Sequence, residues 1–454
     1  MCISHRCSGN CCFYRVAYYT LAKLSAWRYT GVLSNLPKLS CWDAAMRICF
    51  AIFTLMVGTT AFADDSWPGF RGPNGDGHSQ SKTAPTTWSE TENVKWKVAV
   101  HDKGWSSPVV VGEQVWVTTA LENGKEFFAV CLDRKTGKTI HDLHLFSDKN
   151  PPNIRQFNSY ASPTPVIDDG KIYAHFGSRG TACIDTQSGK VLWSRDDLPC
   201  DHWRGPASSP IVYKDWLFLL FDGHDKQYTA CLNKITGKTV WQKDRGLPYP
   251  NDGDLKKAFA TASVFEIDGK AQLVTPAAVG TLGYDPATGE ELWRVIHGGM
   301  NEACRPVMAH GLIYLTTGHT AGLIAVRAGQ MGDITKTGIA WRADKIAPTR
   351  PSPTIVGDLL FMVNDTGIVF CLDAKTGDKH WQERLDGKFS ASPVLAGGNL
   401  YFFSEGDKSF VIAATKTYTP IATNKLDAGC KASPAIMGGN LYVRTLTHLY
   451  CIGQ

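Results

Sequence analysis

The sequence has little excess charge once its first residues are set aside. Residues 1–63 hold six of the 47 basic and one of the 42 acidic residues, so residues 64–454 carry 41 of each sign. Nucleic-acid binding depends on clustered positive charge that displaces counterions, and attraction to an anionic membrane surface needs the same excess. We therefore predict no nucleic-acid partner and no electrostatic membrane contact.

Several catalytic signatures are also missing. The chain contains no G-x-S-x-G, H-E-x-x-H, P-loop, protein-kinase catalytic-loop or C-x-x-C-H motif. His224, His319 and His448 could meet near an axis, but their spacing resembles no metal site, and we predict none. The catalytic residues, if any exist, stay unknown, because a triad assembles from distant segments.

Paired cysteines are scarce as well. Six of the fourteen cysteines lie in the first 49 residues, and these include the single adjacent pair, Cys11-Cys12. Five others recur at one position of a repeat, where we expect small buried core residues: Cys131, Cys183, Cys231, Cys371 and Cys451. A disulfide among Cys200, Cys304 and Cys430 is left open.

What the chain has in abundance is a repeated hairpin. "CLDAKTGDKHW" (371–381) returns as "CIDTQSGKVLW" (183–193) and "CLNKITGKTVW" (231–241), with "GYDPATGEELW" (283–293) and the looser "CLDRKTGKTIH" (131–141). Each copy reads as a strand, an Asp or Asn turn with Gly at a positive φ, and a second strand. The tryptophans at its end are interpreted as packing residues between repeats.

Two separate anchors give the same number of repeats. The first is the residue aligned with Cys371, with spacings of 39 to 52 residues: Cys131, Cys183, Cys231, Gly283, Ala325, Cys371, Ile412 and Cys451. The second is a Ser-Pro site upstream of each hairpin: Pro108, Pro163, Pro210, Ala262, Pro306, Pro353, Pro393 and Pro434. Each unit carries four short strands, which predicts an all-β, eight-bladed β-propeller of four-stranded antiparallel blades.

Closure of the ring is expected from the chain ends. The last unit stops before its fourth strand, while "NVKWKVAV" (93–100) precedes the first unit and supplies Trp96 where other units have their tryptophan. We predict that this N-terminal strand completes the last blade. The expected domains are a leader over 1–63, an extended segment over 64–92 and the propeller over 93–454.

The leader has the pattern of a secretory signal. Met46 and Arg47 precede an apolar region over 48–62 and a small-x-small end, which predicts cleavage after Ala63 and export to the periplasm or cell envelope. The apolar region is shorter than the roughly 20 residues that a membrane span needs, so no integral span is expected. Whether Met46 is the true initiator is left open.

Ligand sites in a propeller gather on one face. We call the loop that leads into the first strand of a blade its inlet loop, and the face carrying these loops the inlet face. Aromatic rings that stack and guanidinium groups that bind oxygens in pairs suit sugars, carboxylates or a peptide backbone, although an ordinary polar rim would look alike. The residues expected at this ligand- or partner-binding face are Trp105, Arg155, Asn158, Tyr160, His202, Trp203, Arg204, Phe259, Asn301, Glu302, Arg305, Arg350 and Lys431.

The pattern D-x-x-T-G-K-x-x-W, with A-S-P-V and a glycine-rich hairpin before it, resembles the pyrroloquinoline quinone (PQQ) repeat from about residue 94 to the end. The leading "WPGFRGPNGDG" (67–77) is similar to exported PQQ-like propeller proteins of planctomycete bacteria. The resemblance implies one of two branches. Quinoprotein alcohol dehydrogenases stack PQQ between a Trp and a disulfide of adjacent cysteines, with Ca²⁺ held by Glu, Asn and Asp; BamB-like subunits of outer-membrane assembly bind partners and no cofactor.

From this resemblance we predict an exported, non-catalytic, BamB-like scaffold that binds an envelope protein or polysaccharide, acts as a monomer and carries no cofactor. The alternative is a PQQ-dependent oxidoreductase with Ca²⁺ and a divergent pocket. A hydrolase or lyase acting on envelope polysaccharide is a third hypothesis. The repeat identifies the fold more specifically than the function.

Overall fold

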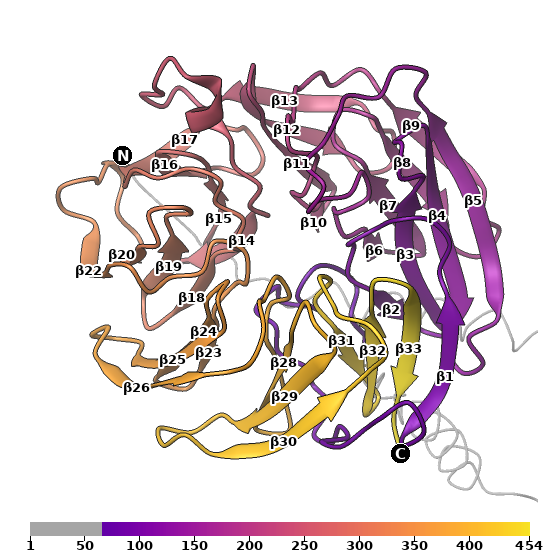
Figure 1. Cartoon of the computed structure of the whole chain (residues 1–454). Helices are drawn as coiled ribbons and strands as arrows, with labels where there is room; N and C mark the ends of the chain where they lie inside the picture. The colour runs from indigo at the N-terminus through magenta and orange to yellow at the C-terminus, as the bar shows by residue number, and fades with distance from the viewer. Residues whose placement is uncertain (1–65) are drawn as a thin grey trace, which may run out of the picture. The chain divides into compact units, whose positions relative to one another are not determined.

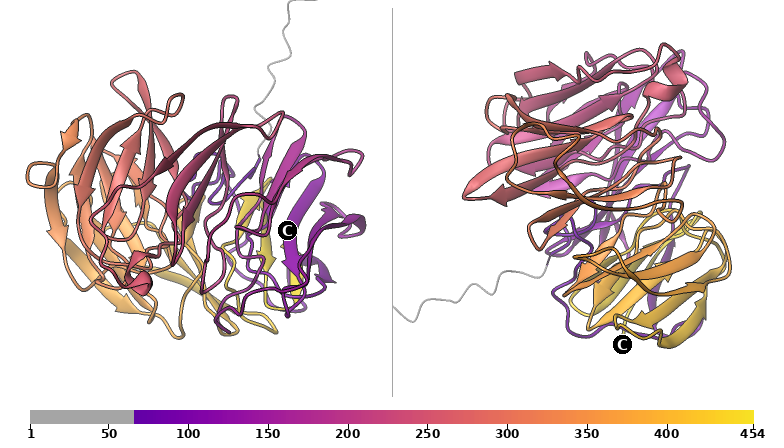
Figure 2. Two further views of the ribbon diagram at one scale, coloured as in Figure 1. Left: turned by 90° about the horizontal axis from the view of Figure 1, so that it is seen from above. Right: turned by 90° about the vertical axis from the view of Figure 1, so that its left-hand side faces the viewer.

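The structure is a computed structural model that describes residues 66–454, so the predicted signal, its cleavage site and Met46 lie outside the described residues. The described residues form eight sheets that follow one another around a common centre (Figure 1; Figure 2). Each contains four antiparallel strands, and one sheet adds a fifth strand that pairs in parallel. The predicted eight-bladed propeller is confirmed.

The blades are numbered along the chain. Blades 1 and 2 consist of β2 (Val109–Val111), β3 (Gln114–Ala120), β4 (Glu126–Asp133), β5 (Thr139–Ser147), and β6 (Val166–Asp168), β7 (Lys171–His175), β8 (Thr181–Asp185), β9 (Val191–Arg195). Blades 3 and 4 consist of β10 (Ile211–Tyr213), β11 (Trp216–Asp222), β12 (Gln227–Asn233), β13 (Thr239–Asp244), and β14 (Ser263–Ile267), β15 (Lys270–Pro276), β16 (Gly280–Tyr284), β17 (Glu291–Ile296). A short 3₁₀ helix, η1 (Gly253–Lys256), lies between them in sequence.

Blades 5 and 6 consist of β18 (Val307–Ala309), β19 (Leu312–Thr316), β20 (Leu323–Arg327), β22 (Ile339–Ala343), and β23 (Thr354–Val356), β24 (Leu359–Val363), β25 (Ile368–Asp373), β26 (Lys379–Arg384). Blades 7 and 8 consist of β27 (Val394–Ala396), β28 (Asn399–Phe403), β29 (Lys408–Ala413), β30 (Pro420–Lys425), and β31 (Ala435–Met437), β32 (Asn440–Arg444), β33 (His448–Ile452), β1 (Val94–Ala99). In blade 8 the N-terminal β1 pairs antiparallel with the C-terminal β33, and Trp96 lies opposite Cys451 (Figure 1).

The repeated hairpin has the same internal structure in most blades. In blade 1 the Asp133 carboxylate accepts hydrogen bonds from the backbone N–H of Lys135 and Thr136 and from the Thr136 hydroxyl, and Gly137 follows with φ 69°. These bonds satisfy turn donors that the two strands cannot reach, and glycine adopts the positive φ without strain. The D-x-x-T-G pattern is thus a turn whose side chains fold back on its own backbone.

The tryptophan at the end of each hairpin joins neighbouring blades. Trp193 Nε1 donates to the carbonyl oxygen of Lys234 at 3.0 Å, and Trp341 Nε1 donates to that of Ala374 at 3.1 Å; both acceptors lie in the hairpin turn of the next blade. The hydrophobic core is accordingly divided into clusters between adjacent blades, such as the one holding Tyr314 and Leu360. The interpretation of these tryptophans as packing residues agrees with these contacts.

Blade 4 departs from this rule. Trp293 Nε1 donates to Gln272 Oε1 within its own blade. The segment between β20 and β22 instead reaches across, and β21 (Gly332–Asp333) pairs parallel with β17 as a fifth strand. Strand addition therefore takes the place of the tryptophan contact between blades 4 and 5.

Both sequence anchors need a small correction. A β-bulge follows the anchor residue in six blades, and in blade 7 it follows Val411, so Val411 and not Ile412 is the equivalent residue. In blade 2 the first strand begins directly after Pro165, so the equivalent proline is Pro165 and not Pro163. The motif "SPTP" offers two prolines, and sequence spacing alone did not choose between them.

The segment over residues 66–92 runs along the face opposite the inlet loops and ends against blades 7 and 8. Trp67 pairs with Val110 of β2 through two backbone hydrogen bonds, and Leu395 of β27 bonds with Gly77 and Ser79. Trp88 then stacks on Phe403 with a ring-centroid distance of 5.8 Å. The segment is thus attached to the first strand of blade 1 and to the first strand of blade 7.

Candidate functional site

A chain of hydrogen bonds fixes the inlet loops relative to one another. The residue directly before the first strand's proline donates its backbone N–H to the hydroxyl at the same position of the next blade, from Ser107 to Thr164 at 2.9 Å and from Thr164 to Ser209 at 3.0 Å. Ser352 and Ser392 continue the pattern at 2.9 Å. In each bond the hydroxyl of serine or threonine is the acceptor. Arg305 stands at this position in blade 5 and donates its backbone N–H to the Ser352 hydroxyl at 2.9 Å.

The inlet loops joined by these hydrogen bonds surround a cavity of about 740 Å³. All eight inlet loops contribute to its wall, and loops between second and third strands contribute on the side of blades 5 to 7. The residues three positions before the first strand's proline are Trp105, Ser162, Ala207, Phe259, Ala303, Arg350, Ser390 and Lys431, and all of them line it. Charged or polar lining residues from other positions include Asn158, Arg204, Asn301, His319, Lys345, Asn364, Asp365, Lys388 and Glu405.

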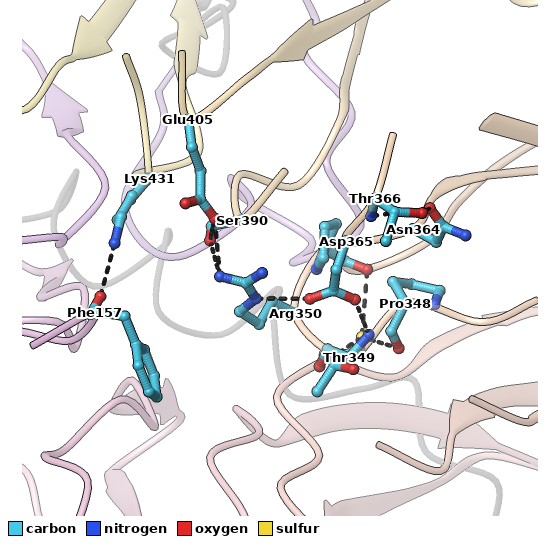
Figure 3. Close-up of polar contacts among 12 residues, drawn as sticks. Phe157, Pro348, Thr349, Arg350, Asn364, Asp365, Thr366, Ser390, Glu405 and Lys431 are labelled. Carbon is cyan, nitrogen blue, oxygen red and sulfur yellow. Dashed lines mark hydrogen bonds and ion pairs between the residues drawn. The ribbon is translucent and has the colours of Figure 1, made fainter. Parts of the chain in front are cut away.

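Arg350 is the most firmly held of the lining cations (Figure 3). Its Nε donates to Asp365 Oδ1 at 2.6 Å, and its Nη1 donates to Glu405 Oε1 at 2.8 Å and to the Ser390 hydroxyl at 2.7 Å. Asp365 Oδ2 also accepts the backbone N–H of Thr349 at 2.6 Å. Blades 6 and 7 thus share one guanidinium between two carboxylates.

Lys431 and Trp105 face each other across the seam between blades 8 and 1. The Lys431 ammonium lies 5.2 Å from the centroid of the Trp105 ring. It donates to the carbonyl oxygen of Phe157 at 2.8 Å (Figure 3). Lys103 approaches the same ring at 5.6 Å. Desolvation by burial lowers the pKa of Lys431 from its ordinary value, and the nearby Glu405 carboxylate opposes that change.

Asn158 and Asn301 make the side-chain contacts on the other side of the cavity wall. The Asn158 amide donates to the carbonyl oxygens of Arg204 and Pro206 and therefore fixes the inlet loop of blade 3. Asn301 contacts His319, with 3.3 Å between Asn301 Nδ2 and His319 Nδ1. Burial lowers the pKa of His319, and the Arg204 guanidinium acts in the same direction.

The structure brings part of the predicted face together. Trp105, Asn158, Arg204, Phe259, Asn301, Arg350 and Lys431 line the cavity. Six other predicted residues do not: Arg155, Tyr160, His202, Trp203, Glu302 and Arg305. Tyr160 was assigned to the rim through Pro163; it is buried in the core of blades 1 and 2, and with Pro165 as the equivalent proline Ser162 stands at that rim position.

Three of the six lie elsewhere on the inlet loops. Trp203 is 44% exposed, and its ring lies 5.8 Å from the Arg155 guanidinium and 5.7 Å from the Lys257 ammonium. His202 points away from the cavity, where its Nε2 accepts the backbone N–H of Ser178 at 3.1 Å and burial lowers its pKa to about 4. These residues form a separate cluster around blade 3.

Glu302 and Arg305 lie beneath the surface. Glu302 is 1% exposed, neither carboxylate oxygen has a hydrogen-bond partner among the described residues, and burial raises its pKa well above the ordinary value. Arg305 bonds to the carbonyl oxygen of Phe70 and to the Ser263 hydroxyl, on the side of the cavity away from the inlet face. The loop "GGMNEACRP" therefore sends side chains both into the cavity and behind it.

The inner end of the cavity is formed by a segment that sequence reasoning did not include. Phe70 lines the cavity, and the fully buried Arg71 follows it. Arg71 donates to the carbonyl oxygens of Ser352 and Pro353 and to the Thr354 hydroxyl. Neither residue belongs to the repeat, so its period gave no signal for them.

The dehydrogenase branch would need a disulfide platform and calcium ligands. In the described part of the chain, the eight cysteines are buried free thiols, including Cys200, Cys304 and Cys430, and no two are adjacent. The same part contains no group of three or more His, Cys, Asp or Glu side chains that could hold a metal ion. Residues 66–454 thus lack the disulfide platform of that branch. Nor does any helix within residues 66–454 have the length and apolar character needed to cross a bilayer.

Comparison with known proteins gives one family model and several distant relatives. The model described as outer membrane protein assembly factor BamB matches residues 80–199, 129–383 and 278–425. Tetrathionate hydrolase of Acidithiobacillus ferrooxidans is 24% identical over 259 residues, 54% of this chain and 49% of that protein. Quinoprotein alcohol dehydrogenase PedH of Pseudomonas putida is 28% identical over 194 residues, 40% of this chain and 29% of that protein. The chain therefore aligns with about half or less of these relatives' lengths.

Two solved structures share the fold at low identity. BamB from Moraxella catarrhalis matches with a TM-score of 0.57 and 13% identity, covering 79% of this chain and 99% of that one. Quinohemoprotein alcohol dehydrogenase from Comamonas testosteroni matches with a TM-score of 0.61 and 10% identity, covering 86% and 81%. At such identities the likeness shows the fold alone.

Proposed function

Because this chain belongs to the PQQ-repeat propeller family whose model is described as outer membrane protein assembly factor BamB, we propose that it is an exported, non-catalytic binding protein that holds part of an envelope protein in its axial cavity. The observation that carries the proposal is the form of this cavity. Eight inlet loops build its wall and Phe70 lies at its inner end, so a segment of a partner can enter from the inlet face. A concave site with a few fixed polar groups is the usual form of a binding pocket.

The side chains in the wall support binding by a preorganised surface. Arg350 is held by Asp365, Glu405 and Ser390, and Asn158 is held by two carbonyl oxygens of the next inlet loop. A partner that meets such fixed groups orders few side chains, and this limits the entropy lost on binding. Trp105 and Phe259 add apolar area of the kind that dominates interface energies.

The test is to fill the cavity without changing its charge. The variant Ala303→Trp places a large ring among the lining residues, and Lys243→Trp places the same ring on the exposed outer strand β13 as a matched control. Both variants and the wild type are immobilised, exposed to envelope extract, and the captured proteins are identified by mass spectrometry. We expect Ala303→Trp alone to lose a protein that the other two retain; equal capture by all three, with folding verified by circular dichroism, contradicts the proposal.

A PQQ-dependent oxidoreductase is the second candidate. It is supported by the alignment with the dehydrogenase PedH and by the aromatic and cationic residues of the cavity, which suit a flat anionic molecule. Titration of the purified protein with PQQ and Ca²⁺ would then change the quinone absorbance and yield reduction of an electron-accepting dye with an alcohol. An unchanged absorbance spectrum contradicts this candidate and leaves the binding proposal standing.

A further inference from the structure

The cavity lining has an excess of positive charge that residues 64–454 as a whole lack. Residues 64–454 carry equal numbers of acidic and basic residues. The lining includes five lysine and arginine side chains, Arg204, Lys345, Arg350, Lys388 and Lys431, against two carboxylates, Asp365 and Glu405. Both carboxylates contact Arg350, so one guanidinium already offsets much of their charge.

The other four lining cations have no such partner. Within the described part of the chain, no carboxylate oxygen lies within 4.0 Å of the charged nitrogens of Arg204, Lys345, Lys388 or Lys431. Lys431 is held by a carbonyl oxygen and an aromatic face, which accept its hydrogen bond and its charge without neutralising it. The lowered pKa of Lys431 reflects the same uncompensated burial.

Two more cations lie behind the inner end of the cavity. Arg71 is fully buried, and it donates to backbone carbonyl oxygens and to the Thr354 hydroxyl. The Asp76 carboxylate raises the pKa of both Arg71 and Arg305 and so offsets part of their charge. Arg305 is bonded to the Phe70 carbonyl oxygen and the Ser263 hydroxyl. Burial lowers the pKa of each to about 10, so both stay charged at neutral pH. Charges inside a low-dielectric wall act on a cavity over a longer distance than charges in water.

The wall also offers more hydrogen-bond donors than acceptors. Among the described residues, Trp105 Nε1 and Arg204 Nε have no acceptor, whereas Asn301 Oδ1 is the one buried lining acceptor without a donor; all three side chains line the cavity. An indole and a guanidinium can donate but not accept. A ligand rich in acceptor oxygens is therefore favoured over one that brings donors of its own.

We propose that the ligand of this cavity is anionic and presents two or more carboxylates together, with Arg204, Lys388 and Lys431 as the groups it meets and with Arg71 and Arg305 raising the local potential from behind. This inference rests on the proposed function and names the chemistry of what is bound. The carboxylates have two sources, a free small polycarboxylate or an acidic loop or chain end of a protein. Because Phe70 lies at the inner end, the cavity accepts a tip and not a chain that passes through.

The experiment measures binding of matched probes by calorimetry. Citrate represents a free polycarboxylate and triethyl citrate its uncharged counterpart; an amidated hexaglutamate peptide represents an acidic protein segment and amidated hexaglutamine its neutral counterpart. We expect at least one anionic probe to bind and its neutral counterpart to bind about tenfold more weakly or not at all, which corresponds to about 1.4 kcal/mol. Binding by citrate or by hexaglutamate identifies the source.

Charge variants complete the test. Lys388→Gln with Lys431→Gln should weaken anion binding about tenfold, because each removes a Coulomb attraction in a partly desolvated site. Lys190→Gln with Lys243→Gln removes the same charge from exposed outer positions and should have little effect. Equal binding of the neutral probes, no anion binding up to about 5 mM, or equal loss in both double variants overturns the inference. The proposed function survives these outcomes if Ala303→Trp still loses its partner.

Discussion

The indole Nε1 of Trp96 donates a 2.9 Å hydrogen bond to the carbonyl oxygen of Arg134, and this bond joins the strand β1 of blade 8 to the hairpin turn of blade 1. Trp193, Trp241, Trp341 and Trp381 make the same bond to the turn of the next blade. The contact at Trp96 differs in that β1 belongs to blade 8 through its pairing with the C-terminal β33, so this bond joins the last blade to the first. The circle of blade contacts is thus completed by the same interaction that repeats within it.

Replacing Trp96 should therefore open the seam. Trp96→Ala removes a ring that is 8% exposed, and core tryptophan truncations cost about 3 kcal/mol of unfolding free energy. Trp96→Phe keeps most of the packing but loses the hydrogen bond, for which we expect about 1 kcal/mol. Urea unfolding followed by tryptophan fluorescence and circular dichroism measures both, and equal stability of Trp96→Ala and wild type would contradict the importance of this contact.

The glycine of the hairpin turn should be required for a second reason besides its dihedral angle. A Cβ on Gly137 would lie 2.9 Å from Trp96 Cδ2, whereas a Cβ on Gly112, which also has a positive φ, would meet no atom within 4 Å. Gly112→Ala thus measures the left-handed strain alone, about 1 kcal/mol. We expect Gly137→Ala to lower the free energy of unfolding by clearly more than Gly112→Ala does. An equal decrease in both variants would show that the Trp96 ring moves aside without an energetic cost.

The repeat explains why so much of the fold could be predicted. In each clear copy the anchor residue of the third strand pairs with the tryptophan of the fourth strand across the turn. Cys231 lies opposite Trp241, and Cys371 lies opposite Trp381 in the same way. The two errors arose where the repeat is ambiguous or worn, at the double proline before β6 and at Val411 in blade 7, which has no D-x-x-T-G turn. Periodicity therefore determines the blades and leaves single positions uncertain by one or two residues.

The cavity was less predictable because its most informative residues are not periodic. Asp365 and Glu405 lie in loops between second and third strands, where sequence reasoning singled out neither carboxylate; both line the cavity and contact Arg350. Phe70 and Arg71 come from the segment before the first blade. These pairings join residues 15, 55 and 282 positions apart and leave no trace in local spacing, so such contacts need coordinates.

Glu302 should make stability fall as pH rises. Its pKa in the folded protein is raised well above the ordinary value, so the folded state holds a proton that the unfolded state has lost above about pH 4.3. Stability is therefore highest near or below that pH and decreases as the pH rises toward the folded value. The variant Glu302→Gln keeps the shape of the side chain and removes the carboxyl group that titrates.

The comparison is made by urea unfolding between pH 5 and pH 9. We expect Glu302→Gln to be more stable than the wild type at high pH and to match it more closely at low pH, while the exposed Glu290→Gln serves as a control with little effect at either. A difference between Glu302→Gln and the wild type that is constant across this range would show that the Glu302 carboxyl does not titrate differently in the two states.

His175 should act in the opposite direction. The side chain is 1% exposed, its Nδ1 lies 2.8 Å from the Thr181 hydroxyl, and desolvation lowers its pKa to about 3. Below about pH 6.5, the pKa of histidine in the unfolded chain, the unfolded state binds a proton that the folded state does not bind. The free energy of unfolding is therefore retained above pH 6.5 and decreases as the pH falls toward 3.

The neutral variant His175→Gln isolates this contribution from the carboxylates that titrate at lower pH. We expect the stability of the wild type to fall more steeply than that of the variant between pH 6.5 and pH 4.5, whatever the absolute cost of the substitution at neutral pH. The neighbouring His202 also has a lowered pKa, of about 4, and continues to contribute in both proteins. Parallel stability curves for wild type and His175→Gln over this interval would mean that His175 becomes protonated without unfolding.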